Sequence, residues 1–233
     1  MATGHTVKAF DEDLGQLRAL ISEMGGRAET AITGALEALV NRDLESAAKI
    51  VEGDRRIDEL EAEVERQVVR LIALRAPLAD DLREVLAALK ISGLVERMGD
   101  YAKNIAKRIA LVQEARGMEA LSVLPVMGKI VTEMVRNVLD AFVMRDAEAA
   151  TAVAARDKAV DDFYNSLFRT LLTHMMENPH NITASTHLLF VAKNLERIGD
   201  HATNVAEMVY FAATGRQMAE RPKGEDPLIG EAG

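Results

Sequence analysis

The sequence predicts an all-α protein built as two tandem three-helix bundles related by internal duplication, and three observations support this fold class. Aromatic residues make up only 4 % of the chain and there are five prolines, whereas Ala, Leu, Val and Met are plentiful, a composition typical of helices packed on helices. No segment alternates apolar and polar residues as a half-buried strand does. The segment 96–104 returns 100 positions later as 196–204, and 233 residues can bury two small cores.

Apolar residues recur at steps of three and four along six segments, which we expect to be helices. In order, these segments are 7–40, 43–75, 80–114, 122–143, 147–177 and 182–213. The second ends before Pro77, and Asn178-Pro179 forms the turn between the fifth and the sixth. Within the first segment, Gly25-Gly26 either bends the helix or lets a neighbouring helix approach closely.

The repeat divides the chain into two domains and a tail. We expect the first bundle at 6–116 and the second at 120–213, with a joint near Gly117. Residues 214–233, rich in Gly, Pro and charge, are expected to be disordered. Further matches at an offset of 103 extend the repeat into the second helix of each half: Arg42 with Arg145, Asp43 with Asp146, Asp54 with Asp157, and Asp58 with Asp161.

Composition excludes several functional classes. The net charge of -9, from 28 basic and 37 acidic residues, argues against a direct nucleic-acid partner, because phosphate contacts need clustered Lys and Arg. With no cysteine there is no thiolate metal site, and a reducing compartment suits the chain. Asp11, Glu12 and Asp13 stand where a signal peptide would be apolar, and no run is long enough to span a bilayer. We therefore expect a soluble, cytoplasmic protein that meets a membrane only through partners.

Four pairs of acidic residues, each spaced by four, lie on helix faces that also carry apolar residues. The pairs are Asp54 and Asp58, Glu96 and Asp100, Asp157 and Asp161, and Glu196 and Asp200. At 100° per residue, Asp54 shares its direction with Ile72, and Glu96 lies close to Val85 and Leu89. Because carboxylates are rarely buried without partners, we expect a positive charge between them.

Counting from the turns predicts which pairs meet. Asp58 and Glu96 each lie 19 residues from Pro77, and Asp54 and Asp100 each lie 23 residues from it. An antiparallel hairpin about this turn therefore brings four carboxylates to one level, about 30 Å from the turn. The same count about the turn between the fifth and sixth helices predicts a second group of four. We call these groups box 1 (Asp54, Asp58, Glu96, Asp100) and box 2 (Asp157, Asp161, Glu196, Asp200).

The chemistry of the boxes favours metal binding. Oxygen ligands without cysteine suit hard cations such as Mg²⁺, Mn²⁺, Ca²⁺ or Fe³⁺, and the residues leave open which of Fe, Mn, Mg or Zn is bound. Four negative charges per box are enough for more than one ion. Asn104 and Asn204, one turn beyond, would add amide oxygens or support the ligands from outside.

Two other interpretations stay open. In the first, the acids pair with basic residues and the protein is a metal-free helical scaffold; the nearby candidates are Arg55, Arg56, Arg97, Lys158 and Arg197. In the second, the chain is a carboxylate-bridged di-metal oxidase or an iron-storage bundle, whose sites usually need Glu-x-x-His pairs. Gly99 and Gly199 stand where those histidines would be, and we assign them only tight helix packing. Since no catalytic arrangement is evident, we expect a protein that is not an enzyme.

Several motifs together closely resemble the PhoU family of phosphate-uptake regulators. They are the doubled Glu-Arg-x-Gly-Asp unit, the earlier Asp-x-x-x-Asp pairs, the opening segment 6–14, and Asp81-Leu82-Arg83 after Ala76-Pro77. The likeness covers 6–213 and implies multinuclear metal clusters on the residues of box 1 and box 2, and commonly a homodimer. One departure is that Leu94-Val95 precedes the first Glu-Arg where the second repeat has Asn194-Leu195. It leaves the acids of box 1 intact.

The resemblance also implies a function. Members of this family act as a brake when phosphate is plentiful. They work with the ATPase subunit of a Pst-type phosphate ABC transporter and with a PhoR-type sensor histidine kinase to keep phosphate-starvation genes off. We therefore expect an adaptor in negative regulation, on which bound metal presents a positive patch to acidic partner residues or to phosphate.

Overall fold

The computed structural model describes residues 3–112 and 120–219, and within these ranges every regular element is a helix. The elements are α1 (Thr3–Asn41), α2 (Leu44–Gly53), α3 (Arg55–Arg75), α4 (Asp80–Arg108), the 3₁₀ helix η1 (Ile109–Val112), α5 (Ala120–Met144), α6 (Ala147–Ala154), α7 (Asp157–Glu177), the 3₁₀ helix η2 (Pro179–Asn181) and α8 (Ile182–Thr214). The all-α prediction is confirmed. The expected joint near Gly117 and most of the expected tail lie outside the described residues.

Two of the six expected helices are broken, which corrects the prediction of one continuous second helix in each half. The first break falls at Asp54, where the Ile57 N–H donates to the Asp54 carbonyl at 2.8 Å and tightens the turn. The second falls just before Asp157, where the Arg156 N–H donates to the Val153 carbonyl at 3.0 Å. Each break stands directly at the first acid of its half.

The turn before α2 is repeated before α6, as the duplication predicts. Arg42 and Arg145 both adopt positive φ, at 58° and 56°. Asp43 and Asp146 follow them and cap the next helix, each accepting two backbone N–H bonds with its carboxylate. Equivalent residues in the two halves thus build the same local structure.

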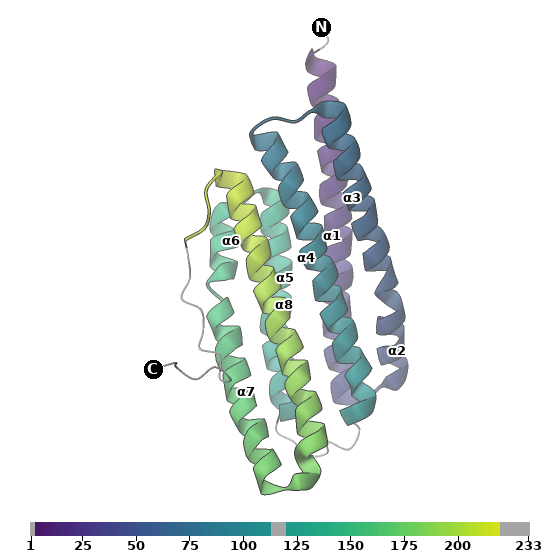
Figure 1. Cartoon of the computed structure of the whole chain (residues 1–233), viewed down its shortest axis with the longest axis vertical. Coiled ribbons are helices and arrows are strands. Elements are labelled where there is room, and N and C mark those ends of the chain that lie inside the picture. The colour runs from purple at the N-terminus through teal and green to yellow at the C-terminus, as the bar shows by residue number, and fades with distance from the viewer. Residues whose placement is uncertain (1–2, 113–119, 220–233) are drawn as a thin grey trace.

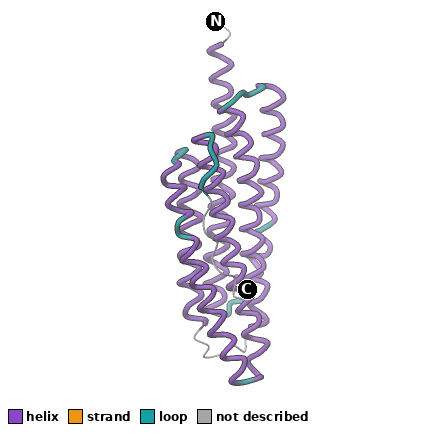
Figure 2. Tube along the Cα trace, turned by 60° about the vertical axis from the view of Figure 1, so that its left-hand side comes forward, coloured by secondary structure: helices purple, strands orange, loops and turns teal. Residues whose placement is uncertain are grey.

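The two bundles pack side by side along their length (Figure 1). Helices α1 to α4 form the first and α5 to α8 the second, and α4 with α8 and α1 with α5 join them. The buried apolar side chains form one core that runs through both bundles. The result is an elongated rod of nearly parallel helix axes, with the start of α1 projecting beyond one end (Figure 2).

Helices α4 and α8 run in opposite directions, so the two repeats are related by a pseudo-two-fold axis across the rod. The α3–α4 turn lies at the top of Figure 1 and the α7–α8 turn at the bottom. Near the middle of the α4–α8 contact, the rings of Tyr101 and His201 lie 5.4 Å apart. Further along, Arg108 lies 3.2 Å from His187 Nδ1. The two copies of the acidic motif therefore sit at similar heights on neighbouring helices.

The α1–α5 contact is equally symmetric and depends on glycine. A Cβ atom at Gly25 would clash with Leu139 Cδ1, and one at Gly128 would clash with Leu36 Cδ1. These pairs are equivalent at the offset of 103. Of the two roles considered for Gly25-Gly26, Gly25 therefore provides close approach of a neighbouring helix.

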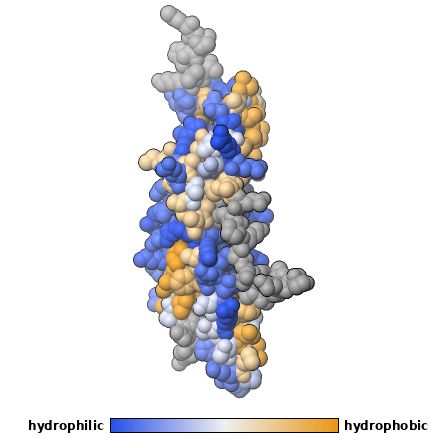
Figure 3. Space-filling view, turned by 90° about the vertical axis from the view of Figure 1, so that its left-hand side faces the viewer, coloured by the Kyte–Doolittle hydropathy of each residue, from blue (hydrophilic) through white to orange (hydrophobic). Residues whose placement is uncertain are grey.

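Figure 3 shows the side of α6 and α7, where hydrophilic residues cover most of the face and apolar residues gather in separate patches. Within the described ranges, none of the helices has an apolar stretch long enough to cross a lipid bilayer.

Candidate metal centres

Asp54 of box 1 lies at the junction of α2 and α3, and its side chain is only 6 % exposed. It occupies the N-cap position of α3 but makes no capping bond to the helix. Its carboxylate instead accepts a hydrogen bond from the Lys103 ammonium, which also donates to Asp100 Oδ1 at 2.6 Å. Asp54 and Asp100, which the count from Pro77 places opposite each other, thus share one cation.

Gly99 allows the α2–α3 junction to approach α4 this closely. A Cβ atom there would lie 2.8 Å from Ile57 Cδ1 and 3.3 Å from Asp54 Oδ1. In the second half, a Cβ atom at Gly199 would lie 3.3 Å from Val160. Both glycines have the tight-packing role that the sequence assigned to them.

The other two acids of box 1 lie in a negative environment. Partial burial, with the charges of Asp54 and Asp100, raises the pKa of Asp58 above its usual range, against the opposing effect of Lys103. Burial and the charges of Asp100, Glu61 and Asp58 likewise raise the pKa of Glu96. Glu61, one turn after Asp58, also has a raised pKa, from burial first and then from Glu65 and Asp58. Glu61 therefore belongs to this acidic group, although the sequence analysis did not include it.

Box 2 is organised in a similar way at the start of α7. Asp157 is the first residue of α7, and Asp161 follows one turn later. The negative charges of both residues act on Asp200 of α8. Partial burial and then the charges of Asp157 and Glu196 raise the pKa of Asp161 to about 6. Partial burial and the charges of Glu196 and Asp157 raise the pKa of Asp200 to about 7, although its side chain is still exposed on one side.

Glu196 completes box 2. One oxygen, Oε1, accepts a hydrogen bond from Lys193 Nζ at 2.7 Å, and the other, Oε2, is buried without a hydrogen-bond partner. Lys193 also lies over the ring of Tyr164, at 4.9 Å from its centroid. Tyr164 stands at the position equivalent to Glu61, so box 2 lacks the fifth acid of box 1.

The acids are less deeply buried than the helical wheel predicted. Asp54 is buried, Glu96, Asp100, Asp157, Asp161 and Glu196 are half-buried, and Asp58 and Asp200 are exposed. The boxes lie at the breaks in the second helix of each half, at the junction of α2 with α3 and of α6 with α7. The half-buried Asn104 and Asn204 lie one turn further along α4 and α8.

Of the arginines that the scaffold interpretation named, Arg97 partly offsets the negative charge around Glu96 and Glu61, whereas Arg55 and Arg56 pair with acids outside the boxes. Arg55 and Arg56 both pair with Glu59, and Arg56 also reaches Glu23. The ammonium groups in the boxes come instead from Lys103 and Lys193. The sequence does mark this position as different between the two copies, because the residue equivalent to Lys103 in the second copy is Thr203.

The residues of the boxes fit a hard cation by type, but the cluster is not closed. Among the residues that the structure describes, no three or more His, Asp or Glu side chains are arranged to hold a metal ion as they stand. The unpartnered Glu196 oxygen is a feature that a cation would satisfy, whereas the Lys103 ammonium already pairs with Asp54 and Asp100. Metal binding would draw the carboxylates together by side-chain rotation, and it stays a prediction.

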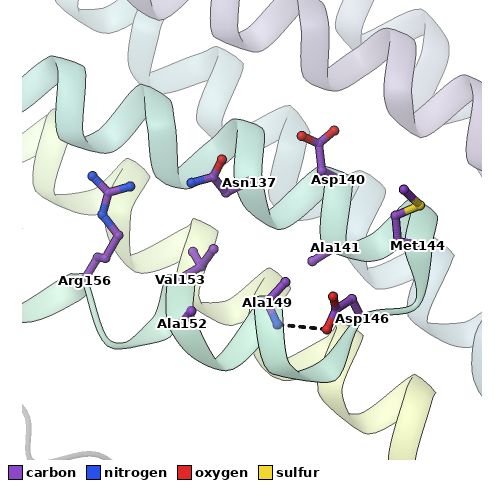
Figure 4. A pocket seen from close by; sticks show the side chains of 9 residues that line it. All are labelled: Asn137, Asp140, Ala141, Met144, Asp146, Ala149, Ala152, Val153 and Arg156. Atoms are coloured by element: carbon purple, nitrogen blue, oxygen red, sulfur yellow. Dashed lines mark hydrogen bonds between the residues drawn. The ribbon is translucent and has the colours of Figure 1, made fainter.

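A separate hollow of about 350 Å³ lies between α5 and α6 (Figure 4). Its floor is made of alanines and Val153, with Arg156 at one end and Asp140 and Asp146 at the other. Asp146 caps α6 through the Ala149 N–H at 2.9 Å. Arg156 pairs with Glu133 at 2.7 Å. Asp146 and Arg156 therefore already have structural partners.

Comparison with known proteins identifies the family. The PhoU domain profile matches residues 21–109 and 124–209. The chain is 63 % identical to a phosphate-specific transport system accessory protein PhoU homolog of Zymomonas mobilis, over 98 % of this chain and 96 % of that protein. It is 51 % identical to the homolog of Caulobacter vibrioides, over 95 % of this chain and 97 % of that protein.

Solved structures agree with this assignment. The crystal structure of PhoU from Pseudomonas aeruginosa superimposes with a TM-score of 0.85 at 35 % identity, covering 89 % of this chain and all of that one. The phosphate transport system regulatory protein PhoU from Streptococcus pneumoniae gives a TM-score of 0.84 at 29 % identity, covering 91 % of this chain and all of that one. This chain, with two copies of the domain and the same fold, belongs to the PhoU family.

Proposed function

We propose that this protein is a cytoplasmic, non-enzymatic regulator of phosphate uptake that holds the phosphate-starvation response off when phosphate is plentiful. It acts as an adaptor between the ATPase subunit of a Pst-type phosphate ABC transporter and a PhoR-type sensor histidine kinase, and it works as a homodimer. The observation that carries the proposal is the match, over both repeats, to proteins named as accessory to phosphate-specific transport. The rigid rod with two acidic boxes at similar heights suits an adaptor that docks on partners.

The test is a deletion strain that carries a phosphate-starvation reporter. In high phosphate we expect constitutive reporter expression in the deletion strain and repression on return of the intact gene. Unchanged expression on deletion would refute the brake for this chain. Pull-down of the sensor kinase and of the transporter ATPase with purified protein tests the two partners separately.

We propose further that boxes 1 and 2 each bind hard metal ions through Asp54, Asp58, Glu96, Asp100 and through Asp157, Asp161, Glu196, Asp200. Bound metal would turn two negative surfaces into positive ones that attract acidic groups on a partner. The support is the donor set, the raised pKa values of Asp58, Glu96, Asp161 and Asp200, and the orphaned oxygen of Glu196.

Metal analysis of protein purified without chelators tests this part. We expect bound metal in the wild type and its loss in a chain that carries both Asp100→Asn and Asp200→Asn. The matched control is Glu52→Gln, which removes an exposed charge two residues before Asp54. If the double variant loses metal yet binds the kinase and the ATPase as the wild type does, the positive-patch role is wrong.

A further inference from the structure

Helices α4 and α8 lie side by side along the middle of the rod, in front of α1 and α5 in Figure 1. Their shared seam carries a row of cationic and aromatic side chains that are exposed or half-buried. We call this row the central stripe, and its members are Arg97, Tyr101, Arg108, Phe190, Arg197 and His201. None of them is acidic, although the chain as a whole has 37 acidic and only 28 basic residues.

Two contacts across the seam place arginines on aromatic rings. The Arg108 guanidinium of α4 lies 4.2 Å from the centroid of the Phe190 ring of α8, and its Nη1 lies 3.2 Å from His187 Nδ1. The Arg197 guanidinium of α8 lies 5.8 Å from the centroid of the Tyr101 ring of α4. Such a contact orients a guanidinium group without neutralising it, because the ring carries no net charge.

Arg97 lies one turn before Tyr101 on α4, at the position that matches Arg197 in the repeat. The pKa of His201 is lowered first by burial and then by the charges of Arg97 and Arg197, so both arginines act on this ring. The His201 ring lies 5.4 Å from the Tyr101 ring. Two arginines that the repeat relates therefore lie near one pair of rings.

The charges of these arginines are not cancelled by direct contacts. In residues 3–112 and 120–219, none of Arg97, Arg108 and Arg197 forms an ion pair with a carboxylate. Arg97 offsets part of the charge of Glu96 and Glu61 at longer range. Box 1 lies on the α3 side of α4 and box 2 on the α7 side of α8, so the central stripe is a line of positive charge between two acidic groups.

From this geometry we propose that the central stripe is the docking surface for an acidic segment of a partner protein, whose Asp and Glu side chains pair with Arg97, Arg108 and Arg197. Arginine clusters recognise acidic motifs because a guanidinium group holds a carboxylate with two parallel N–H bonds. Eleven positions separate Arg97 from Arg108, which is about 16 Å along α4. A single small anion cannot meet all three cations, whereas a segment of several residues can. The inference does not depend on metal in the boxes.

A nucleic acid fits the central stripe less well than an acidic protein segment does. Single strands bind by stacking their bases on free aromatic faces, but Arg108 lies over Phe190 and Arg197 lies over Tyr101. A strand also carries a phosphate at every nucleotide, and the acids of the boxes on both sides would repel those phosphates. A protein segment can place its carboxylates only where the stripe is positive.

The test is fluorescence anisotropy with a labelled peptide of Glu and Ala, about 14 residues long, which spans the stripe as a helix. The same peptide with Gln in place of Glu is the uncharged probe. A chelator keeps the protein free of metal. We expect the wild type to bind the Glu peptide and not the Gln peptide, and the binding to weaken as salt is added.

Arg97→Gln with Arg197→Gln should weaken binding of the Glu peptide about tenfold, because two charged contacts are lost. The matched control is Arg66→Gln with Arg70→Gln, which removes the same charge from exposed positions on α3 and should change the affinity less than about twofold. Arg97→Lys with Arg197→Lys keeps the charge and should lose less affinity than the Gln pair. Circular dichroism checks that each variant is folded.

Two results would overturn the docking surface: equal affinities for the variant and its matched control, or no binding of the Glu peptide to the wild type. A labelled oligothymidine that binds more tightly than the Glu peptide, and is released by the same variant, would overturn it as well and would assign the stripe to single-stranded nucleic acid. Because the protein is free of metal, none of these results bears on the metal centres proposed above, and the reporter strain tests the regulatory role separately.

Discussion

The buried carboxylate of Glu84 connects the two repeats. Its side chain on α4 is only 3 % exposed. Glu84 Oε1 forms an ion pair with Arg18 of α1, and Glu84 Oε2 forms one with Arg145 of the α5–α6 turn at 3.2 Å. Arg145 belongs to the second repeat, so this contact joins the halves as well as the helices. A carboxylate buried this deeply persists only when its charge is compensated.

Replacing Glu84 by Gln should destabilise the protein by about 2 kcal/mol, because Arg18 and Arg145 lose their shared charged partner but keep partial access to solvent. Urea unfolding followed by circular dichroism measures the change. The exposed substitution Glu52→Gln should stay within about 0.5 kcal/mol of the wild type. Equal stabilities for the two variants would mean that the contact contributes little.

The carboxyls of box 2 predict a pH dependence for the metal-free protein. The pKa values of Asp161 and Asp200 are raised to about 6 and about 7 from a usual value of 3.8. At a pH between the usual value of 3.8 and the raised value, each of these carboxyls keeps its proton in the folded state but has lost it in the unfolded state. These groups therefore lower the stability as pH rises from about 4 to about 7, and the loss is complete above that range.

Thermal melting of chelator-treated protein between pH 5 and pH 8 checks this prediction. The chain with Asp161→Asn and Asp200→Asn should show a shallower fall in melting temperature over this range than the wild type. Asp162→Asn, which removes an exposed neighbouring charge, should keep most of the wild-type slope. Equal slopes in all three would contradict the assignment to box 2.

At the scale of the helices, periodicity and turn residues predicted six segments close to the observed ends, but not the two breaks. Gly53 precedes the break at Asp54, whereas the second break follows Ala154 and has neither Gly nor Pro. Local sequence therefore carries no consistent signal for it. Tertiary contacts set the position of Asp54 instead. Its carboxylate pairs with Lys103 and makes no capping bond to α3, and Gly99 on α4 has no side chain to block this close approach. Counting residues from each turn predicted which acids oppose one another. The count did not predict that Lys103 lies among them, because that depends on how α4 packs against the α2–α3 junction.

The adjacent glycines of α1 offer a direct test of helix contact. Gly25→Ala should destabilise the protein by about 1–2 kcal/mol, because the new methyl group displaces Leu139 and this outweighs the gain of about 1 kcal/mol in helix propensity. Gly26 has nothing within 4 Å of the same position, so Gly26→Ala should stabilise by up to about 1 kcal/mol. Chemical denaturation of both variants gives the comparison. A stabilising Gly25→Ala would show that Leu139 repacks at no cost.

At the scale of the whole molecule, the sequence predicted two bundles in tandem but not how they lie. Their arrangement depends on the contacts of α4 with α8 and of α1 with α5. In the sequence, each of the contacting faces is only an apolar stripe, which does not show which helix it packs against. In the structure the stripes meet across the halves, and one core continues through both bundles. The division into domains along the chain is thus not a division of the core.

A shared core predicts a single cooperative unfolding transition for the full chain. Differential scanning calorimetry should give a van't Hoff enthalpy equal to the calorimetric enthalpy. Two resolved transitions, or a calorimetric enthalpy about twice the van't Hoff value, would indicate bundles that unfold independently.

The pseudo-two-fold axis between α4 and α8 has one more consequence. A homodimer of single repeats could build the same rod, but its symmetry would force every side chain to appear twice, once on each side of the axis. Joining both repeats in one polypeptide lifts that constraint. Lysine at 103 where the second repeat has threonine at 203, and Glu61 where it has Tyr164, are differences that a homodimer of identical repeats could not hold. The linkage is therefore what allows one scaffold to carry two centres of unequal character.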